Sequence, residues 1–442
     1  MSAPAWRVYA NRVVAAEISA LTRYYDRVVQ YARLDHDGGL LFDLVDCPQK
    51  AVVPAGESLS GLRSPGERCA VLLNGNFNHS HDIQGLLDTI KRDAGRDARI
   101  VAVVYNSYFA PIFRLANRLG LRAGTPPATF VTYTDLDNIA RLAGFRVVRT
   151  RAAVYSPFRL LGLGTLLNTI LPAVPLLRHL SFTAIVVLAP VAGTREPVSI
   201  SVIVPARNER GNIERALEGL RAVRSALPGL EVVFVEGHST DGTWEEIQRT
   251  IPRYAQDFTI TAFQQTGAGK GDAVRLGFGR ATGDVVTILD ADLTVPPSAL
   301  PRFYNAYRDG LGDFINGSRL VYGTESGAMR PLNRLGNVLF AKALSRVLSV
   351  RLGDSLCGTK LFARHDYARF TAWRRDFGDF DPFGDFEMLF PAAILGLAVV
   401  DLPIRYLART YGTTQISRFR HGWMLLKMTT IGFLRVRLGI TR

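Results

Sequence analysis

The chain has 442 residues and carries 53 lysines and arginines against 39 aspartates and glutamates, a formal net charge of +14. This length exceeds the usual size of one hydrophobic core, which predicts two domains. The three cysteines show no paired or metal-type spacing and suit a reducing cytoplasm. No zinc spacing or RNA-binding signature accompanies the positive charge, so we predict no nucleic-acid partner.

Strands and helices alternate in the first 190 residues. Apolar runs predict four strands, and apolar positions at helical spacing predict two helices. The predicted strands are Cys69–Asn74, Ala98–Tyr105, Phe145–Arg151 and Phe182–Leu188, and the predicted helices are Ile83–Ala94 and Leu136–Leu142. The segment Ala189–Glu196 bears proline and glycine, and we predict that it links this domain to a second one.

The second domain begins with two buried strands, each followed by a helix. Ser199–Glu209 is an apolar run that closes in Pro-Ala-Arg-Asn-Glu, and Asn212–Ala222 has apolar residues at helical spacing. Leu230–Thr243 contains the next strand, with Glu236 at its tip, and a helix is predicted to begin near Trp244. This alternation predicts a largely parallel sheet that binds ligands at the carboxyl ends of its strands.

A further buried strand, Val285–Leu289, is followed by two aspartates that are one residue apart. Because successive side chains of a strand point to opposite faces, Asp290 and Asp292 point the same way. Two neighbouring carboxylates repel each other unless a cation lies between them, and Mg²⁺ prefers oxygen ligands. The pair therefore predicts a metal site that could hold the diphosphate of a nucleotide-linked substrate. Pro205–Glu209 and Glu236–Asp241 would lie on the same edge of the sheet.

These three segments resemble the signatures of inverting family 2 glycosyltransferases with the glycosyltransferase-A fold. The resemblance covers residues 197–420 and is to the branch of polyprenyl-phosphate (dolichyl-phosphate) sugar synthases. The motifs that carry it are Ser201–Glu209, Glu236–Thr243, Gly269-Lys270-Gly271, Asp290–Asp292, Gly317-Ser318-Arg319, Asp354–Phe362, Asp385-Phe386-Glu387 and Arg409–Gly412. It implies a two-domain α/β enzyme of cell-envelope glycan biosynthesis, in which residues 197–442 form the transferase domain.

The resemblance implies a pocket for a nucleotide-sugar donor and a divalent cation, Mg²⁺ or Mn²⁺. The implied metal ligands are Asp290 and Asp292, and Asp292 is also catalytic because the cation neutralises the leaving diphosphate. The implied donor-binding residues are Pro205, Ala206, Asn208, Glu209, Glu236, Asp241, Lys270, Asp290 and Ala291. One departure concerns Glu236-Gly237, where the family usually has two aspartates, and it leaves the preferred nucleobase open.

Two classes of acceptor remain open. A polyprenyl phosphate is already ionised and needs cations rather than a base, and the resemblance assigns Arg319, Arg334 and Arg409 to it. A hydroxyl of a growing cell-surface glycan needs a general base, for which Asp385 or Glu387 is the candidate. A third alternative, from another class, is a scaffold that docks a glycan-biosynthesis complex through its first half.

Residues 1–190 resemble the second half of a class I S-adenosylmethionine methyltransferase in the order of their elements, with Asn74-Gly75-Asn76 after the first predicted strand. The glycine-rich turn that approaches the cofactor would precede Arg68, and residues 1–67 contain no strand–GxGxxG–helix unit. We predict a degenerate methyltransferase-like domain that binds no cofactor and has a structural or partner-docking role.

The carboxyl-terminal segment is both basic and aromatic. Arg405–Arg442 has seven arginines, one lysine and no acidic residue, interleaved with apolar residues such as Trp423. Such a segment suits the surface of an anionic membrane. The most apolar stretch, Phe158–Leu188, is interrupted by Arg159 and other polar residues, so no transmembrane helix is expected. With no signal peptide expected, we predict a cytoplasmic protein peripherally associated with the inner face of the plasma membrane.

Overall fold

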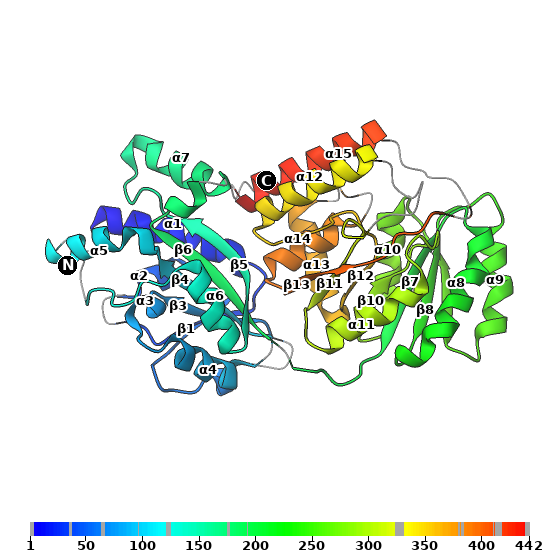
Figure 1. Ribbon diagram of the computed structural model, residues 1–442, viewed down its shortest axis with the longest axis horizontal. Coiled ribbons are helices and arrows are strands. Elements are labelled where there is room, and N and C mark those ends of the chain that lie inside the picture. The colour runs from blue at the N-terminus through cyan, green and yellow to red at the C-terminus, as the bar shows by residue number, and fades with distance from the viewer. Residues whose placement is uncertain are drawn as a thin grey trace.

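The computed structural model describes residues 4–34, 38–62, 67–95, 97–120, 125–174, 177–191, 193–322, 331–378, 381, 384–409, 411 and 418–437. They form two separate sheets with helices packed around them, one from the first half of the chain and one from the second (Figure 1). The mixed α/β class predicted from the sequence is confirmed.

The first sheet has six strands in the order β2-β1-β3-β4-β6-β5, and it is parallel except for β6, which is antiparallel to both of its neighbours. Its strands are β1 (Arg27–Tyr31), β2 (Gln49–Val53), β3 (Cys69–Asn74), β4 (Arg99–Tyr105), β5 (Phe145–Ala153) and β6 (Thr183–Pro190). The α-helices of this half are α1 (Ala5–Thr22), α2 (Leu40–Leu44), α3 (Asn76–His79), α4 (Ile83–Ala94), α5 (Ala110–Arg118), α6 (Tyr133–Leu142) and α7 (Leu163–Ile170).

The six elements predicted in this half are all present. β3 and α4 have the predicted bounds, and β4, β5, β6 and α6 differ from the prediction by a few residues at their ends. Local capping explains where the helices begin. Asp82 accepts a hydrogen bond from the backbone N–H of Gly85 at 2.8 Å before α4, and Thr132 and Asp135 form a capping box before α6.

The second sheet has seven strands in the order β13-β11-β12-β10-β7-β8-β9, and β12 is antiparallel to its neighbours. Its strands are β7 (Ile200–Ala206), β8 (Glu231–Glu236), β9 (Thr259–Gln264), β10 (Val285–Ile288), β11 (Phe314–Ser318), β12 (Lys360–Ala363) and β13 (Val399–Pro403). The α-helices are α8 (Arg210–Val223), α9 (Thr243–Tyr254), α10 (Lys270–Arg280), α11 (Leu300–Arg308), α12 (Pro331–Leu348), α13 (Arg364–Phe377), α14 (Phe386–Ile394) and α15 (Arg418–Gly432).

The register of the parallel strands brings three polar segments to one edge of this sheet. Ala206 at the end of β7 pairs with Glu236 at the end of β8, and Ile203 of β7 pairs with Ile288 of β10. The carboxyl ends of β7, β8 and β10 therefore meet at one edge, which confirms the arrangement predicted from the sequence. All three strands lie in the buried core of this half.

Buried arginines of the first half form ion pairs with the second half. Arg99 on β4 is almost fully buried, and its Nη2 lies 2.7 Å from the carboxylate of Asp313. Arg68, just before β3, pairs with the buried Asp366 of α13. Such pairs are costly to break, because the arginine left without its partner would be a buried charge. The two halves are therefore joined by polar contacts that fix their relative position.

The same interface covers the carboxyl-terminal end of α14. The Tyr25 hydroxyl donates to the Leu395 carbonyl at 2.7 Å, and Arg99 Nε donates to the Gly396 carbonyl at 2.7 Å. The last carbonyls of a helix have no partner within the helix, and cations at this end are favourable. Residues of the first half thus satisfy the end of a helix whose other end bears two of the candidate site residues, Asp385 and Glu387.

α12 and α15 pack against each other and lie along the upper edge of the molecule as drawn in Figure 1. Across the described part of the chain, no helix has both the length and the apolar character that a membrane span requires. Of the predicted basic segment Arg405–Arg442, the structure describes residues 405–409, 411 and 418–437.

Candidate functional site

The carboxyl end of β10 carries two aspartates, and each is paired with a cation. Asp290 Oδ1 lies 2.6 Å from Nζ of Lys270, the first residue of α10. Asp292 Oδ2 lies 2.5 Å from Arg409 Nη2, and Asp292 Oδ1 accepts from the Thr294 hydroxyl at 2.8 Å. The side chains of Asp290 and Asp292 remain 25% and 14% exposed, so a ligand can reach both.

The pair formed by Lys270 and Asp290 is ionised and only partly exposed. Burial favours the neutral acid and is the largest single influence on Asp290. The charge and hydrogen bond of Lys270, with the charges of Lys360 and Arg319, together outweigh it and hold the pKa of Asp290 below its usual value. Burial would lower the pKa of Lys270, but the negative charges of Asp290, Asp385 and Asp292 and the hydrogen bond to Asp290 together raise it. A Cβ at Gly358 would lie 2.3 Å from Lys270 Nζ and 2.4 Å from Asp290 Oδ2. Only glycine therefore fits beside this pair as it stands.

Arg409 connects the ends of two strands. Its Nη1 lies 3.7 Å from Oε1 of Glu209, which follows β7, while Nη2 contacts Asp292 after β10. Burial raises the pKa of Glu209 to about 7, and the hydrogen bond from Asn212 and the charge of Arg409 offset this only in part. The negative charges of Asp292 and Asp241 add to the rise. Glu209 is therefore a carboxyl group that titrates near neutral pH.

The loops after β7 and β8 are joined by side-chain hydrogen bonds. Asn208 has a positive φ of 55°, and its Oδ1 accepts from the backbone N–H of Thr240 at 2.9 Å. Glu236 accepts from the backbone N–H of Ser239 at 2.5 Å. Burial would raise the pKa of Glu236, but the hydrogen bonds from Ser239 and Gln264 hold it below its usual value. Both predicted donor-binding side chains thus have a fixed position at this edge.

Asp241 holds together the starts of α8 and α9. It accepts from the backbone N–H of Arg210 at 3.2 Å and of Thr243 at 3.1 Å, and the Tyr411 hydroxyl lies 3.4 Å from it. Burial would raise the pKa of Asp241, but these hydrogen bonds lower it.

Three further residues predicted to bind the donor lie on the same edge. Ala206 and Ala291 are buried, whereas Pro205 is partly exposed. The two alanines can therefore contribute backbone groups and shape to a pocket, since their side chains carry no polar atom.

The three arginines predicted to bind an acceptor phosphate do not form one cluster. In the described residues, Arg409 alone of the three forms an ion pair with the aspartates at the end of β10. Arg319 is bidentate with the buried Asp354, at 2.7 and 2.9 Å. Arg334 is exposed on α12 and donates to the Leu320 carbonyl at 3.3 Å. Arg409 therefore has the best position for a phosphate beside the donor edge.

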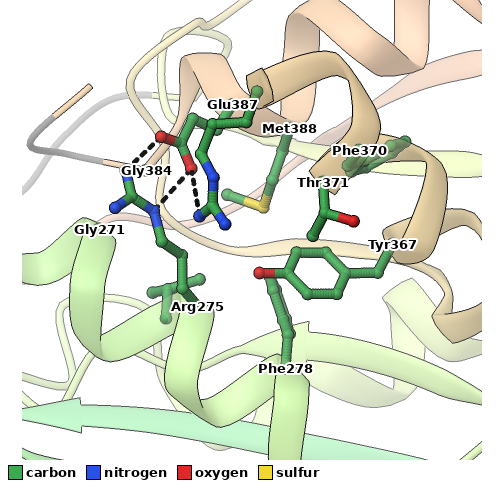
Figure 2. A pocket seen from close by; sticks show the side chains of 11 residues that line it. Gly271, Arg275, Phe278, Tyr367, Phe370, Thr371, Gly384, Glu387 and Met388 are labelled. Carbon is green, nitrogen blue, oxygen red and sulfur yellow. Dashed lines mark hydrogen bonds and ion pairs between the residues drawn. The ribbon is translucent and has the colours of Figure 1, made fainter. Parts of the chain in front are cut away.

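The two candidate bases are each engaged by a cation. Asp385 Oδ1 lies 2.5 Å from Nζ of Lys360, which is fully buried in β12. Glu387 forms a two-pronged ion pair with Arg275 of α10, in which Nε lies 2.9 Å from Oε2. Arg374 Nη1 lies 3.9 Å from the same carboxylate. Figure 2 shows Glu387 and Arg275 at one side of a pocket that aromatic side chains also line.

The aspartates at the end of β10 fit a divalent cation in chemistry but do not enclose one by themselves. Carboxylate oxygens are the ligands that Mg²⁺ and Mn²⁺ prefer. Among the residues that the structure describes, no group of three or more acidic, histidine or cysteine side chains is arranged to hold a metal. A cation at Asp290 and Asp292 would compete with Lys270 and Arg409 and take its other ligands from substrate or water.

Sequence analysis missed the residues that hold the candidate carboxylates in place. Lys360 and Gly358 lie within the recognised segment Asp354–Phe362 but received no role, although a lysine directly before the apolar residues Leu361–Ala363 is a usable signal. Nothing local marked Arg275 as the partner of Glu387, because 112 positions separate them.

Comparison with known proteins places a family domain in the second half of the chain. Residues 201–370 match the model of Glycosyl transferase family 2. The low-salt glycan biosynthesis hexosyltransferase Agl6 of Haloferax volcanii is 30% identical over 227 residues, which are 51% of this chain and 51% of that protein. The chain thus spans about half the length of this relative.

Two further similarities each cover about half of the chain. The dolichyl-phosphate hexose transferase of Haloferax volcanii is 28% identical over 226 residues, 50% of this chain and 89% of that protein. The crystal structure of the glucosyl-3-phosphoglycerate synthase of Mycobacterium tuberculosis is 20% identical, with a TM-score of 0.39, and covers 55% of this chain and 81% of that one. Residues 201–370 are thus similar to Glycosyl transferase family 2. The domain boundaries and the methyltransferase-like resemblance of residues 1–190 stay predictions.

Proposed function

We propose that this chain transfers a sugar, with inversion, from a nucleotide-sugar donor to a lipid-linked phosphate such as a polyprenyl phosphate. The observation that carries the proposal is the convergence of Asp290, Asp292, Glu209 and Arg409 at one sheet edge. This edge belongs to the domain that matches Glycosyl transferase family 2. The similar dolichyl-phosphate hexose transferase carries a lipid phosphate of this class in its name.

The loops after β7 and β8 would bind the nucleoside of the donor. Their hydrogen bonds fix Asn208, Glu236 and Asp241 before any ligand arrives. A preformed pocket binds more tightly because less conformational entropy is lost on binding. We assign the backbone of Pro205, Ala206 and Ala291 to the walls of this pocket.

Positive charge would stabilise the leaving diphosphate. A divalent cation, Mg²⁺ or Mn²⁺, held by Asp290 and Asp292 would supply electrostatic neutralisation at the diphosphate oxygens. Lys270 already lies beside Asp290 and would add a second positive charge there. Both charges act most strongly as the bond from the anomeric carbon to the diphosphate oxygen breaks.

A phosphate acceptor fits the state of the candidate bases. The acceptor oxygen is already ionised, so it can form the new bond to the anomeric carbon without losing a proton. Asp385 and Glu387 contact Lys360 and Arg275, and neither pairing is what a free general base requires. Arg409 would bind the acceptor phosphate, because a guanidinium matches phosphate oxygens in bidentate fashion.

Arg319 and Arg334 would have lesser parts in acceptor binding. The pairing of Arg319 with Asp354 suggests that it contributes fixed positive charge rather than direct contact. Arg334 is exposed on α12 and would meet the lipid phosphate on its approach. The alternative, transfer to a glycan hydroxyl, would require Asp385 or Glu387 to leave its cation and accept a proton.

The first half would act as a structural or partner-docking domain that binds no cofactor. Its buried arginines fix it to the transferase domain. These contacts support a structural role for the first half in an enzyme, rather than the alternative in which the whole chain is only a scaffold. We place the protein at the cytoplasmic face of the plasma membrane. Exposed Leu332, Leu335 and Leu339 follow one face of α12, and no acidic residue occurs in α12 or α15.

The full chain, incubated with labelled nucleotide sugars, Mn²⁺ and a polyprenyl phosphate, tests the proposal. Thermal shifts against a panel of nucleotide sugars would first select the donor, because specific binding raises stability. We expect label to enter the lipid phase only when the lipid phosphate and a divalent cation are both present. Label found only on an oligosaccharide acceptor would contradict the acceptor, and no turnover of any donor would contradict the enzyme.

A further inference from the structure

A segment of the first half presents apolar side chains to solvent. It comprises residues 158–170, which include α7 and the turn before it. Helices of globular proteins normally turn their apolar face to the core, and contiguous apolar surface marks a site of interaction. Leu161 is fully exposed, and the other exposed side chains are Phe158, Leu160, Leu163, Leu166 and Ile170, each about half exposed.

Gly164 and Asn168 are the residues of α7 that face the protein, while Thr165 is exposed at the contact with α1. Asn168 is buried, and its Oδ1 accepts from the backbone N–H groups of Tyr155 at 2.6 Å and Ser156 at 3.0 Å. Its Nδ2 donates to the Ser156 carbonyl at 2.9 Å, and the Thr165 hydroxyl lies 3.1 Å from the Tyr9 hydroxyl of α1. These hydrogen bonds fix the orientation of α7, and with Asn168 turned inward its exposed leucines face solvent.

The turn before α7 is closely packed and strained. A Cβ at Gly164 would lie 1.8 Å from the Phe158 carbonyl oxygen, so the helix and the turn can touch only because residue 164 is glycine. Leu160 and Leu161 have positive φ values of 47° and 53°, a conformation that costs energy for leucine. Strain that holds two leucines on the surface is a cost without benefit to folding, and it points to a function.

The charge around the segment suits an anionic surface. No acidic residue occurs between Asp137 and Glu196. Arg159 lies within the segment and is exposed. Apolar side chains next to arginine, in a stretch of sequence without acidic residues that would repel anionic lipids, are typical of proteins that bind a membrane interface.

The segment lies along the same edge as the other apolar surface. In Figure 1, α7 and the packed pair α12 and α15 follow the upper edge of the molecule. α12 exposes Leu332, Leu335 and Leu339, and α15 exposes Trp423 and Leu426. One flat surface could therefore contact both halves of the chain.

We infer that residues 158–170 are a membrane-docking element of the first half, which inserts its leucines into the interface of an anionic bilayer. Together with α12 and α15 it would hold the molecule at two places and so fix the tilt of the donor edge relative to the lipid. This role goes beyond the proposed transfer reaction. Binding to vesicles needs neither donor nor acceptor. The membrane-docking inference and the proposed transfer reaction can therefore fail independently.

The test is sedimentation of the full-length protein with vesicles of phosphatidylcholine and phosphatidylglycerol. The variant Leu161→Ser/Leu166→Ser is compared with Leu142→Ser/Leu311→Ser, whose leucines are also at least half exposed but lie outside the segment. We expect the partition coefficient of the first variant to fall at least about ten-fold, because two leucine side chains no longer insert into the bilayer. The second variant should bind like the native protein, and Arg159→Gln should weaken binding to anionic vesicles only.

Two further measurements keep the inference testable if the first variant folds poorly. Leu161→Trp should add tryptophan emission that lipids with brominated chains quench, and sedimentation velocity without lipid reports self-association. Unchanged vesicle binding in the first variant, an equal loss in both, or no added quenching would overturn the inference. So would a native dimer that only the first variant dissociates while its vesicle binding stays intact, because a second copy would then cover the segment.

Discussion

Arg409 and Asp292 are 117 positions apart in the sequence, and their side chains form an ion pair with 2.5 Å between Nη2 and Oδ2. The same guanidinium lies 3.7 Å from Glu209, so one cation serves carboxylates from the ends of two strands. A divalent cation at Asp292 would compete for this carboxylate. We therefore expect that donor binding releases Arg409 toward the acceptor.

Replacing Arg409 tests its assignment to the acceptor phosphate. Arg409→Ala should lower the transfer rate by about 10²–10³-fold, as is typical when one group that stabilises developing or bound negative charge is lost. Arg409→Lys should recover only part of the rate, because a point charge lacks the bidentate fork. The measurement is the initial rate as a function of polyprenyl phosphate concentration, with nucleotide affinity checked by calorimetry.

Glu387→Gln is the matched comparison for the other acceptor class. A general base typically contributes about 10²–10⁴-fold, so a hydroxyl acceptor predicts a larger loss in Glu387→Gln than in Arg409→Ala. The proposed phosphate acceptor predicts the opposite order. If Glu387→Gln is inactive but still binds nucleotide, while Arg409→Ala is active, the acceptor is a glycan hydroxyl and not a lipid phosphate.

Asp292→Asn should abolish transfer and remove the effect of Mn²⁺ on nucleotide binding. The amide keeps the size of the side chain and its hydrogen bond with Thr294 but loses the charge that a hard cation requires. Calorimetric titration of the nucleoside diphosphate with Mn²⁺ and with chelator measures this. Equal affinities for native protein under both conditions would remove the metal from the mechanism.

Gly358→Ala should impair activity far more than stability. The added methyl group would overlap Lys270 Nζ and Asp290 Oδ2, both at the ends of side chains that can move away. Displacement of the pair should lower the rate by at least about ten-fold through misplaced charge at the diphosphate. The matched control is Gly336→Ala, which meets no atom within 4 Å and should leave the rate unchanged. Equal rates in both variants would mean that the pair plays no part in transfer.

The raised pKa of Glu209 has a consequence for stability. In the unfolded chain this carboxyl group ionises near pH 4.5, whereas in the native protein burial raises its pKa to about 7. Between these values the native state binds one more proton than the unfolded state, so its contribution to the free energy of unfolding falls as pH rises. Urea unfolding in chelator at several pH values should show this decline, and Glu209→Gln should lack it. A native curve parallel to that of the variant from pH 4.5 to 7 would contradict the shift.

The shared edge of the second sheet could be predicted because it follows from rules that act locally. Buried runs such as Ser201–Ala206 predict parallel strands, and parallel strands place their carboxyl ends together. The pairs that hold the site could not be predicted this way. Lys360 and Asp385 are 25 positions apart and Arg275 and Glu387 are 112 apart, so only the folded chain brings them into contact.

Helix α7 shows a different limit of sequence reasoning. Apolar periodicity predicts which face of a helix is apolar, but the assumption that this face turns inward comes from typical globular proteins. Here Gly164 and Asn168 face the protein, and the leucines face solvent. The signal in the sequence was the apolar stretch Phe158–Leu188, which polar residues interrupt too often for it to span a bilayer.

The contacts of Arg99 should make the two halves unfold together. Arg99 is buried against Asp313 and the Gly396 carbonyl, but Asp313 is 25% exposed and also pairs with Arg195. Arg99→Leu should therefore lower the free energy of unfolding by about 1.5–3 kcal/mol, the range for a lost hydrogen bond to a charged group. Arg141→Leu breaks an exposed pair with Asp137 and should cost at most about 0.5 kcal/mol. Urea unfolding, followed by circular dichroism, should show one transition for the native protein and for Arg141→Leu, and an earlier or split transition for Arg99→Leu. Similar losses in both variants would mean that the interface adds little to the stability of either half, because a buried and an exposed arginine would then have contributed alike.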